Sequence, residues 1–342
     1  MNFAENSRVL ISILNWNGGR ATLDAIRSIY ESDYHNFSIL VIDNASVDGS
    51  IELVENEFPL VHVLRNTSNF GFAGGQNQGI RFAKTNGYEL IWILNNDTRV
   101  APDTLGLLVT EVDTHENVGM VSPVIIDEGT ERIQFCGCSV DFDEFKFVHF
   151  DSLEDAKESQ VISPEKFCIW GTAILSKTSV INDIDGFDEK YFAYYEDLDL
   201  SLRVIRSGYL NKIVPQATVY HAGINDPDQR PPHYVYFNTR NRFIFWNDHL
   251  PNKFYLKFYR EYLAGALIYA STWQEKGDQE RMQVTLLAIW HGIRKVSGPW
   301  NKNNRAPIFL SWLAMTRPYF IASILRGELL ARIKDLFSGG IR

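Results

Sequence analysis

The N-terminal part of the sequence alternates short apolar runs with segments that have helical spacing. Four apolar runs have the length of a buried β-strand, at residues 9–14, 38–43, 61–64 and 89–95. Helical patterns follow the first three runs, and Asp48 is placed to cap the second predicted helix. Strands that are apolar on both faces and alternate with helices are typical of a parallel sheet covered on both sides. The sequence therefore predicts an α/β fold with a mostly parallel, Rossmann-like central sheet and helices on both faces.

Polar segments follow three of the predicted strands, at the point where each strand ends. They read NWNGG at 15–19, DNASVDGS at 43–50 and NNDT at 95–98. In open α/β sheets, ligands bind beyond the carboxyl ends of the strands. Asn, Asp and Gly also suit turns and helix caps, so one such segment alone would indicate only a turn. Three successive strands that bring polar groups to one edge favour a binding site there.

A glycine-rich segment, NTSNFGFAGGQNQG at 66–79, precedes a helix predicted at about 75–84. Such a segment can bring backbone N–H groups and a helix N-terminus close to a diphosphate. It has neither the Gly-Lys-Ser/Thr ending of a P-loop nor the G-x-G-x-x-G fingerprint of dinucleotide-binding enzymes. It therefore argues against both of those classes and leaves nucleotide binding itself open.

The stretch YFAYYEDLDLSLR at 191–203 places aromatic residues directly before Glu196, Asp197 and Asp199. The apolar spacing that follows predicts a helix. A helix N-terminus stabilises negative charge, and Asp199 can pair with Arg203 one turn later, which is sufficient to explain Asp199. Glu196 and Asp197 follow aromatic side chains that would shield a carboxylate from water. Such shielding raises the pKa of a carboxylate and makes it a usable general base.

The middle of the chain, residues 120–176, alternates less regularly and predicts additional antiparallel strands with a mobile acidic insertion at 151–160. It contains the three cysteines, Cys136, Cys138 and Cys168. An odd number of cysteines, in a chain that shows no apolar signal segment, indicates a reducing compartment. Their spacing also differs from the paired ligands of a zinc site.

The end of the chain differs in charge from the rest. The 342 residues exceed the usual limit of about 250–300 for a single core, so we expect one large domain and an appendage. Residues 253–342 carry 14 Lys and Arg against 6 Asp and Glu (+8), whereas residues 1–252 carry 19 against 36 (−17).

Two tail segments, at 253–271 and 307–337, mix aromatic, aliphatic and basic residues at helical spacing. Neither has the roughly 18 apolar residues in a row that a membrane span needs. Basic helices with an apolar face can lie on an anionic membrane. They can equally pack on the rest of the chain or form a homo-oligomer interface, and the sequence leaves these alternatives open.

Seven segments of the chain, taken in order, resemble the motifs of inverting family 2 glycosyltransferases with the GT-A fold. They are ILNWNG, VIDNASVDGS, NFGFAGGQNQG, WILNNDTRVAPDTL, WGTAILSK, GFDEKYFAYYEDLDLSLRVIRSGY and VYHAG. The resemblance covers roughly residues 8–245. Within the family, the chain is most similar to bacterial rhamnosyltransferase-like and galactofuranosyltransferase-like members. It implies a GT-A catalytic domain at 1–250, with a nucleotide-binding half at about 1–120 and an acceptor half at about 121–250. A basic amphipathic helical region would then occupy 251–342.

The resemblance also implies a function. A sugar, with a rhamnose-like deoxyhexose favoured, would move from a nucleotide-diphosphate sugar to a hydroxyl of a growing cell-surface glycan or a lipid-linked acceptor. It implies a Mg²⁺ or Mn²⁺ ion on the diphosphate, no nucleic-acid partner, and a cytoplasmic protein that contacts the inner face of the cell membrane. Two alternatives stay open: a nucleotidyltransferase, and a degenerate GT-A protein that binds nucleotide sugars without catalysis.

Several residues of this chain match positions with known roles in the family. Trp16 matches the aromatic residue that stacks on the nucleobase, and Asp43 the carboxylate that accepts a hydrogen bond from the base. Asp97 matches the last acid of the metal-binding motif, and His221 the histidine that completes that site. The motif here reads Asn95-Asn96-Asp97, with one acid where many relatives have two or three, so the resemblance implies a modest metal affinity and an ion held mostly by the diphosphate. The residues predicted to contact the donor are Asn15, Trp16, Asn17, Asp43, Asn77, Asn96, Asp97, Gly171 and Arg240.

An inverting transfer needs a carboxylate that takes the proton of the acceptor hydroxyl on the side of the sugar opposite the diphosphate. Asp197 matches this base, and proton transfer of this kind contributes about 10²- to 10⁴-fold to a rate. Glu196 would orient its neighbourhood or contact the acceptor. Trp170 and Thr172 would shape the acceptor pocket. The donor sugar, the nucleotide base and the linkage depend on pocket shape and are not readable from the sequence.

Overall fold

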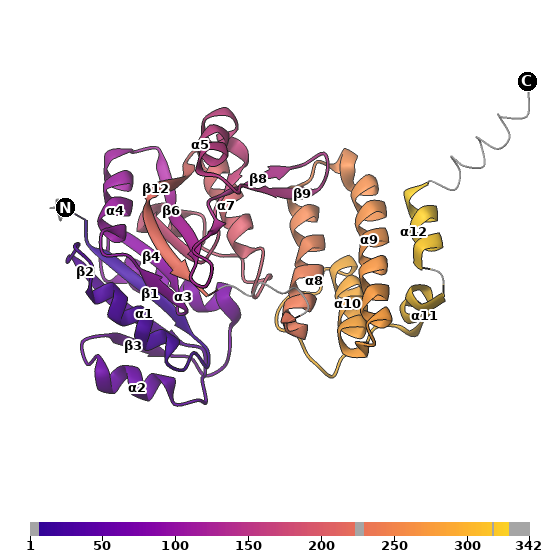
Figure 1. The fold of residues 1–342 in the computed structure, drawn as a ribbon, viewed down its shortest axis with the longest axis horizontal. Coiled ribbons are helices and arrows are strands. Elements are labelled where there is room, and N and C mark those ends of the chain that lie inside the picture. Colours follow the sequence, from indigo (N-terminus) through magenta and orange to yellow (C-terminus); the bar gives the residue numbers. More distant parts are fainter. Residues whose placement is uncertain (1–6, 223–228, 317, 328–342) are drawn as a thin grey trace, which may run out of the picture. The chain divides into compact units, whose positions relative to one another are not determined.

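The computed structural model describes residues 7–222, 229–316 and 318–327. Contacts between residues divide the chain into two compact units, Met1–Asn225 and Asp226–Arg342 (Figure 1). The predicted boundary at 250 falls later than this division. The difference arises because the helix that begins at Pro232 packs against another helix of the C-terminal unit.

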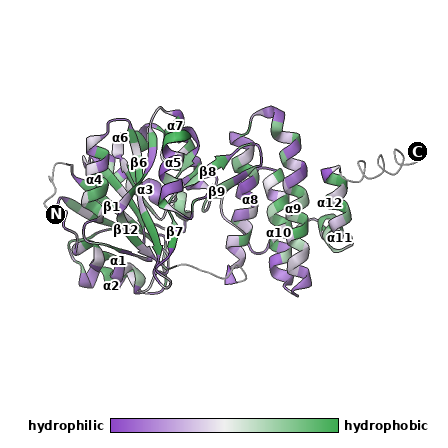
Figure 2. Ribbon diagram, turned by 45° about the horizontal axis from the view of Figure 1, so that its top comes forward, coloured by the Kyte–Doolittle hydropathy of each residue, from purple (hydrophilic) through white to green (hydrophobic). Residues whose placement is uncertain are grey.

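The N-terminal unit is built on a central nine-stranded sheet with the order β3-β2-β1-β4-β11-β6-β12-β5, in which β7 pairs with β6. Strands β1 to β4 are parallel to one another where they pair, and β11 is antiparallel to both β4 and β6. The strands are β1 (Val9–Asn15), β2 (Phe37–Asp43), β3 (His62–Arg65), β4 (Leu90–Asn95), β5 (Thr98–Val100), β6 (Val118–Asp127), β7 (Ile133–Phe135), β11 (Ala173–Lys177) and β12 (Leu210–His221). Figure 2 shows these strands to be mainly hydrophobic, as their burial between helices requires.

Helices pack around this sheet, which confirms the predicted fold class (Figure 1). α3 packs on β1, β2 and β4, while α4 packs on β6 and β12. The helices of the unit are α1 (Ala21–Tyr30), α2 (Ser50–Glu57), α3 (Gly71–Thr85), α4 (Thr104–Thr114), α5 (Leu153–Ile162), α6 (Thr178–Asp183) and α7 (Glu196–Arg206). Asp48 does not occupy the cap position of α2, which belongs to Gly49, but its Oδ1 accepts a hydrogen bond from the backbone N–H of Ser50.

The middle of the chain adds a small antiparallel sheet with the order β10-β8-β9. Its strands are β8 (Cys138–Asp141), β9 (Lys146–His149) and β10 (Phe167–Cys168), and the 3-10 turn Pro164–Lys166 precedes β10. The predicted antiparallel strands are confirmed. The acidic segment at 151–160 was expected to be a mobile insertion, but it forms α5, which Ser152 caps by accepting a hydrogen bond from the backbone N–H of Asp155.

The three cysteines are free thiols buried in this region. Burial raises the pKa of the Cys136 thiol to about 11, and it raises the pKa of Cys138 well above its ordinary value. These thiols therefore stay protonated near neutral pH and behave as small apolar core groups.

The C-terminal unit is helical. It contains α8 (Pro232–His249), α9 (Tyr255–Glu275), α10 (Gln279–Ile293), α11 (Ile308–Thr316) and α12 (Pro318–Arg326), with the 3-10 turn Asn252–Phe254 between α8 and α9. α10 packs on α8 and α9, and α12 packs on α9. No single helix in the described ranges has both the length and the hydropathy needed to cross a membrane. α11 and α12 pass that test only as a pair, with a bend of 97° between them.

Candidate functional site

The carboxyl ends of the parallel strands meet at one edge of the central sheet, as the sequence predicts. Asn15 at the end of β1 lies opposite Asp43 at the end of β2, and Leu14 lies opposite Asn95 at the end of β4. Strand β12 runs parallel to β6, and both have the same direction as β4 because β11 is antiparallel to β4 and β6. His221, the last residue of β12, therefore lies at the same edge.

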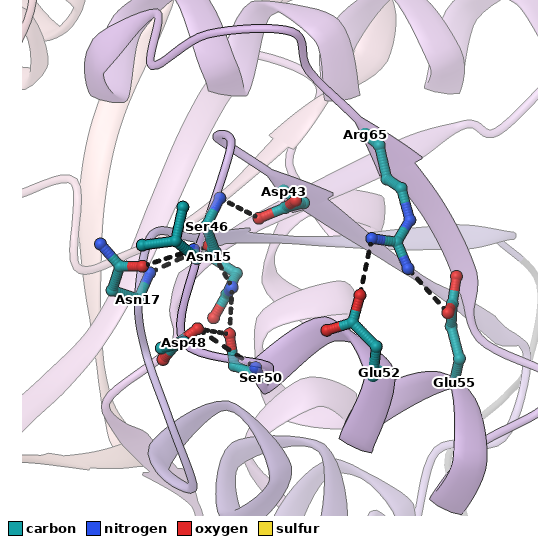
Figure 3. A network of polar contacts seen from close by, with 10 residues as sticks. Asn15, Asn17, Asp43, Ser46, Asp48, Ser50, Glu52, Glu55 and Arg65 are labelled. Carbon is teal, nitrogen blue, oxygen red and sulfur yellow. Dashed lines mark hydrogen bonds and ion pairs between the residues drawn. The ribbon is translucent and has the colours of Figure 1, made fainter.

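Asn15 holds together the two loops that follow β1 and β2 (Figure 3). Its side chain is fully buried, and Nδ2 donates hydrogen bonds of 2.9 Å to Oγ of both Ser46 and Ser50. Its Oδ1 accepts a bond of 2.6 Å from the hydroxyl of Thr22. The sequence predicts direct donor contact for Asn15. In the structure both the oxygen and the nitrogen of its amide are bonded inside the protein, so Asn15 stabilises the loop conformation instead.

Asn17 has a similar part in this loop network. Its backbone N–H donates to Oγ of Ser46, and its Oδ1 accepts from the backbone N–H of Val47. The backbone of Asn17 has a positive φ of 54°, a conformation that Asn tolerates better than most residues. Asn17 is exposed, so these bonds shape the loop while leaving the residue at the surface.

Trp16 and Asp43 form the part of this edge that suits a nucleobase. The Trp16 side chain is 52% exposed, whereas Asp43 is buried and accepts a hydrogen bond of 3.0 Å from the backbone N–H of Ser46. An exposed indole is a stacking surface for a planar base, and a buried carboxylate is a fixed acceptor for an N–H group. The exposure of Trp16 and the burial of Asp43 are compatible with their predicted roles.

Asp97 and His221 lie together at the sheet edge. Nε2 of His221 is 3.3 Å from Oδ1 of Asp97, and Nδ1 of His221 is 2.7 Å from Oε1 of Gln134 in β7. The Asp97 side chain is 45% exposed and that of His221 is 18% exposed, so the pair opens to solvent on the carboxylate side. The predicted pair is thus brought together, and Gln134 is a neighbour that the sequence analysis did not identify.

The Asp97 and His221 pair fits a divalent cation that is held partly by the substrate. In the described part of the chain no cluster of three or more His, Cys, Asp or Glu residues could hold a metal ion alone. A carboxylate oxygen and an imidazole nitrogen at 3.3 Å are close enough to bind one ion together. The remaining ligands would be phosphate oxygens and water, which is the usual arrangement for Mg²⁺ beside a nucleotide.

Asn96 supports this edge from within the protein. Its Nδ2 donates a hydrogen bond of 3.0 Å to the hydroxyl of Thr22, the same hydroxyl that donates to Asn15. A Cβ at Gly18 would lie 2.1 Å from Nδ2 of Asn96, so only glycine fits there. Asn96, Thr22 and Asn15 thus form one chain of hydrogen bonds that links the ends of β4 and β1.

Asp197 is held by backbone donors at the first turn of α7. Its Oδ2 accepts a hydrogen bond of 2.8 Å from the N–H of Gly171, and its Oδ1 accepts one of 2.8 Å from the N–H of Leu198. Burial raises the pKa of the Asp197 carboxyl, while these two hydrogen bonds oppose that rise. The side chain is half-buried, so the carboxylate is both fixed in orientation and open to a ligand.

Glu196 lies deeper than its neighbour. The side chain is buried, and Oε2 has no hydrogen-bond partner among the residues that the structure describes. Burial, and then the nearby charge of Asp197, raise the pKa of Glu196 well above its ordinary value. Both effects favour the protonated form of Glu196 in the folded protein. The predicted contact with the acceptor does not fit the burial of this side chain.

Asp199 and Arg203 form the ion pair that their spacing predicts. Nε of Arg203 donates to Oδ2 of Asp199 at 2.7 Å, and Nη1 donates to the carbonyl of Ile184. The Asp199 side chain is only 3% exposed. This pair fixes the start of α7, on which Asp197 sits.

The segment that leads into α7 has an unusual backbone. Phe192, Tyr194 and Tyr195 all have positive φ, at 68°, 66° and 75°. Each such residue costs of order 1–3 kcal/mol in conformational energy, and strain of this kind concentrates at active sites. The carbonyl of Phe192 accepts a hydrogen bond from the backbone N–H of Ala73 in α3, which ties the segment to the glycine-rich helix start.

Aromatic side chains line the region beside Asp197. The Trp170 ring stacks on Phe135 with centroids 4.1 Å apart, and the His149 ring meets Trp170 edge-on at 5.5 Å. Phe147 of β9 meets Tyr195 edge-on at 5.7 Å. These residues come from β7, from β9 and from the segments that precede β11 and α7. The sequence predicts a site role for Trp170 and for the aromatic residues before Glu196, but no spacing in the sequence brings Phe135, Phe147 and His149 to them.

Three predicted site residues turn out to hold the structure together. Asn77 is buried, and its amide bonds to the backbone of Phe187 at both ends and to Glu189. Thr172 is buried next to Gly171, and its carbonyl accepts a hydrogen bond from the N–H of Asn95. The predicted donor contact of Asn77 is therefore replaced by a tie between α3 and the loop before α7.

Arg240, the third, lies in α8 of the C-terminal unit. Its side chain is fully buried, its guanidinium lies over the rings of Tyr236 and Phe237, and it donates to the carbonyl of Gly298. A buried guanidinium committed to these partners does not suit the predicted contact with a diphosphate. Arg240 is a core residue of the helical unit.

Comparison with known proteins identifies the family. The family model described as "Glycosyl transferase family 2" matches residues 10–182. The dTDP-rhamnosyl transferase RfbF of Shigella flexneri is 26% identical over 304 residues, which cover 86% of this chain and 98% of RfbF. An N-acetylglucosaminyl-diphospho-decaprenol L-rhamnosyltransferase of Mycobacterium tuberculosis is 24% identical over 229 residues, covering 62% of this chain and 75% of that protein.

Solved structures share the fold at low sequence identity. The mannosyltransferase PcManGT of Pyrobaculum calidifontis, in complex with GDP-Man and Mn²⁺, has a TM-score of 0.54 at 18% identity, covering 97% of this chain and 88% of that one. Residues 1–349 of S. aureus TarS, in complex with UDP-GlcNAc, have a TM-score of 0.57 at 14% identity, covering 95% of this chain and 92% of that one. These matches leave the nucleotidyltransferase alternative without support. The chain belongs to glycosyl transferase family 2 and is a glycosyltransferase with the GT-A fold.

Proposed function

We propose that this glycosyltransferase moves a rhamnose-like deoxyhexose, with inversion, from a nucleotide-diphosphate donor to a hydroxyl of a cell-surface glycan or a lipid-linked acceptor. The observation that carries this proposal is Asp197. It is a half-buried carboxylate held by the backbone N–H groups of Gly171 and Leu198. Gly171 joins it, through the hydrogen bond between Thr172 and Asn95, to the end of β4 that precedes Asp97. Two relatives support the choice of sugar, because one is named a dTDP-rhamnosyl transferase and the other an L-rhamnosyltransferase.

Asp197 acts as the general base. The acceptor hydroxyl loses its proton to Asp197 while its oxygen bonds to the anomeric carbon, and the bond from that carbon to the nucleoside diphosphate breaks. The pKa of Asp197, raised by burial, makes it a stronger base than an exposed aspartate. The hydrogen bonds from Gly171 and Leu198 fix the direction from which the proton is taken.

The donor lies along the edge formed by β1, β2 and β4. Trp16 stacks on the nucleobase, and Asp43 accepts a hydrogen bond from it. Asp97 and His221 would hold a divalent cation, Mg²⁺ or Mn²⁺, which stabilises the charge of the departing diphosphate when it is bound. The structure of PcManGT, determined with GDP-Man and Mn²⁺, supports the choice of metal.

A donor and product assay tests this function. The protein is incubated with UDP-, dTDP- and GDP-sugars, Mn²⁺ and N-acetylglucosaminyl-diphospho-prenol, the acceptor type in the name of one relative. We expect dTDP to be released from dTDP-rhamnose, and NMR of the product to show the anomeric configuration opposite to that of the donor. Retained configuration would contradict the inverting mechanism, and release from another sugar alone would contradict the choice of rhamnose.

We further propose that the protein is cytoplasmic and binds the inner face of the cell membrane through α11 and α12. Their exposed apolar side chains are Ile308, Phe309, Trp312, Met315, Tyr319, Phe320 and Ile324. The exposed cations Lys302 and Arg305 lie in the segment before α11, within a tail of net charge +8. Aromatic and aliphatic groups beside cations suit the boundary between anionic headgroups and acyl chains.

Vesicle sedimentation tests the membrane proposal. We expect the protein to pellet with vesicles of phosphatidylcholine and phosphatidylglycerol but not with phosphatidylcholine alone. The double variant Phe309→Ser/Trp312→Ser should stay in the supernatant, while Leu256→Ser should still pellet, because Leu256 is 71% exposed on α9 of the same unit. Binding that survives in the double variant would contradict the proposal. A wild-type protein that self-associates in solution and ignores both vesicle types would instead assign the surface to a homo-oligomer.

A further inference from the structure

Gln134 is the third member of a contact chain that ends at Asp97. Its Oε1 is 2.7 Å from Nδ1 of His221, and Nε2 on the other side of that ring is 3.3 Å from Oδ1 of Asp97. The side chain of Gln134 is half-buried, as is that of His221. Each nitrogen of the imidazole therefore faces a different oxygen.

The chemistry of these oxygens decides where the ring proton lies. An amide oxygen only accepts hydrogen bonds, so Nδ1 must carry a proton to bond with Gln134. In a neutral ring Nε2 then holds a lone pair, which faces the carboxylate oxygen of Asp97. Two acceptors at this distance attract each other only when a cation lies between them or the ring takes up a second proton. The arrangement is therefore suited to a cation bound by Nε2 and Oδ1 together.

An irregularity in the backbone of β7 directs the side chain of Gln134 toward His221. In the pairing of β6 with β7, consecutive residues Ile125 and Ile126 lie opposite Phe135 and Ile133, so Gln134 is the extra residue of a bulge. Bulges of this kind redirect a side chain and occur beside active sites. The same strand β6 pairs with β12 on its other side, where Asp127 lies opposite His221. One strand thus sets the positions of both Gln134 and His221.

We propose that Gln134 is a positioning residue that selects the Nδ1–H tautomer of His221 and so directs the Nε2 lone pair toward Asp97, where the divalent cation binds. This inference rests on the proposed metal site. The opposite arrangement, in which the Gln134 amide nitrogen donates to Nδ1, would give His221 an Nε2–H that points at Asp97 and no lone pair for a metal. The two arrangements make different predictions for the protein without metal.

Nitrogen NMR of the metal-free protein tests the tautomer. Histidine is labelled with ¹⁵N, the spectrum is recorded at a pH where the ring is neutral, and the His221 signals are assigned by comparison with His221→Asn. We expect a protonated Nδ1 in the wild type and in Gln134→Glu, whose side chain can still accept. Gln134→Leu should lose this preference. A wild-type His221 with the proton on Nε2 would overturn the proposal.

Mn²⁺ binding, measured by electron paramagnetic resonance, tests the consequence. Loss of an outer partner of a metal-binding histidine lowers metal affinity by about 10- to 100-fold, so we expect this loss in Gln134→Leu and none in Gln134→Glu. Gln160→Leu is the matched control, because Gln160 is also half-buried and also accepts a hydrogen bond from β12, at the N–H of Ile213. Wild-type Mn²⁺ affinity in a folded Gln134→Leu would overturn the proposal. If the wild type binds no Mn²⁺, the proposed metal site fails, while the NMR result still decides the role of Gln134.

Discussion

The backbone N–H of Gly171 donates a hydrogen bond of 2.8 Å to Oδ2 of Asp197. Gly171 directly precedes Thr172, whose carbonyl accepts a hydrogen bond from the N–H of Asn95 at the end of β4. The proposed base is therefore joined to the strand end that carries the Asn95-Asn96-Asp97 motif by one hydrogen bond to its carboxylate and one backbone hydrogen bond. This connection holds the proposed base at a fixed distance from the proposed metal site, because the only side chain in it is the carboxylate of Asp197.

Replacing the buried acid beside the base should change the pH dependence of stability. The pKa of Glu196 is raised in the folded protein, so the folded state holds a proton that the unfolded state loses above its ordinary value of 4.5. The contribution of Glu196 to stability therefore falls as pH rises above that value. Glu196→Gln should raise the melting temperature at neutral pH and flatten its decline from pH 5 upward. Calorimetry across this range measures the effect, with Glu158→Gln, at an exposed site on α5, as the control. An unchanged slope in Glu196→Gln would show that the buried acid is not neutral.

The contact between the glycine-rich helix and the strained segment should depend on Gly71. Its φ is +74°, and a Cβ there would lie 2.3 Å from the carbonyl oxygen of Phe192. Gly71→Ala should therefore destabilise the protein by more than the roughly 1–2 kcal/mol that positive φ alone costs a non-glycine residue. Gly87→Ala is a matched control, because Gly87 has a φ of +70° and open space at its Cβ position. Chemical denaturation of the two variants compares them. Equal losses would mean that the approach of Phe192 is not constrained.

Much of this architecture is predictable because it is local. Strands β1, β2 and β4 begin and end within a residue of the predicted runs, since each is a continuous apolar segment bounded by polar turns. The start of α3 is predicted less well: the helix begins at Gly71, four residues before the predicted start. Glycines have low helix propensity, so the pattern hides a first turn that Asn69 supports by accepting a hydrogen bond from the N–H of Gly71.

Some residues of the candidate site are also predictable from the sequence, and others are not. The meeting of Asp97 with His221 follows from strand ends and family motifs. Gln134 and His149 lie in strands of three and four residues, which are too short to show a period. Each of these strands pairs with the strand before it, β7 with β6 and β9 with β8. Asn15 and Asn77 have the residue type of ligand-binding groups, but hydrogen bonds to distant residues decide that they act inside the protein.

The ion pair at the start of α7 should matter more than pairs on the surface. Arg203→Met would remove the cation that faces the buried carboxylate of Asp199, which would keep the hydrogen bond from the Tyr191 hydroxyl. Breaking a buried ion pair costs about 3–5 kcal/mol in similar cases, and we expect the lower end here because Arg203 is partly exposed. Arg65→Met breaks the exposed pairs with Glu52 and Glu55 and should cost about 1 kcal/mol or less. Urea unfolding of both variants measures the difference. Similar losses would show that the Asp199 pair is not specially stabilising.

The most direct test of the account is the rate of sugar transfer by Asp197→Asn, with donor affinity measured on the same protein by calorimetry. The asparagine keeps the size of the side chain and can still accept from the N–H of Gly171, but it cannot take a proton from the acceptor. We predict that the transfer rate falls by about 10²- to 10⁴-fold while donor affinity is unchanged. Asp113→Asn, which removes an exposed acid at the end of α4, should transfer at the wild-type rate. Transfer at the wild-type rate by Asp197→Asn would contradict the assignment of Asp197 as the base.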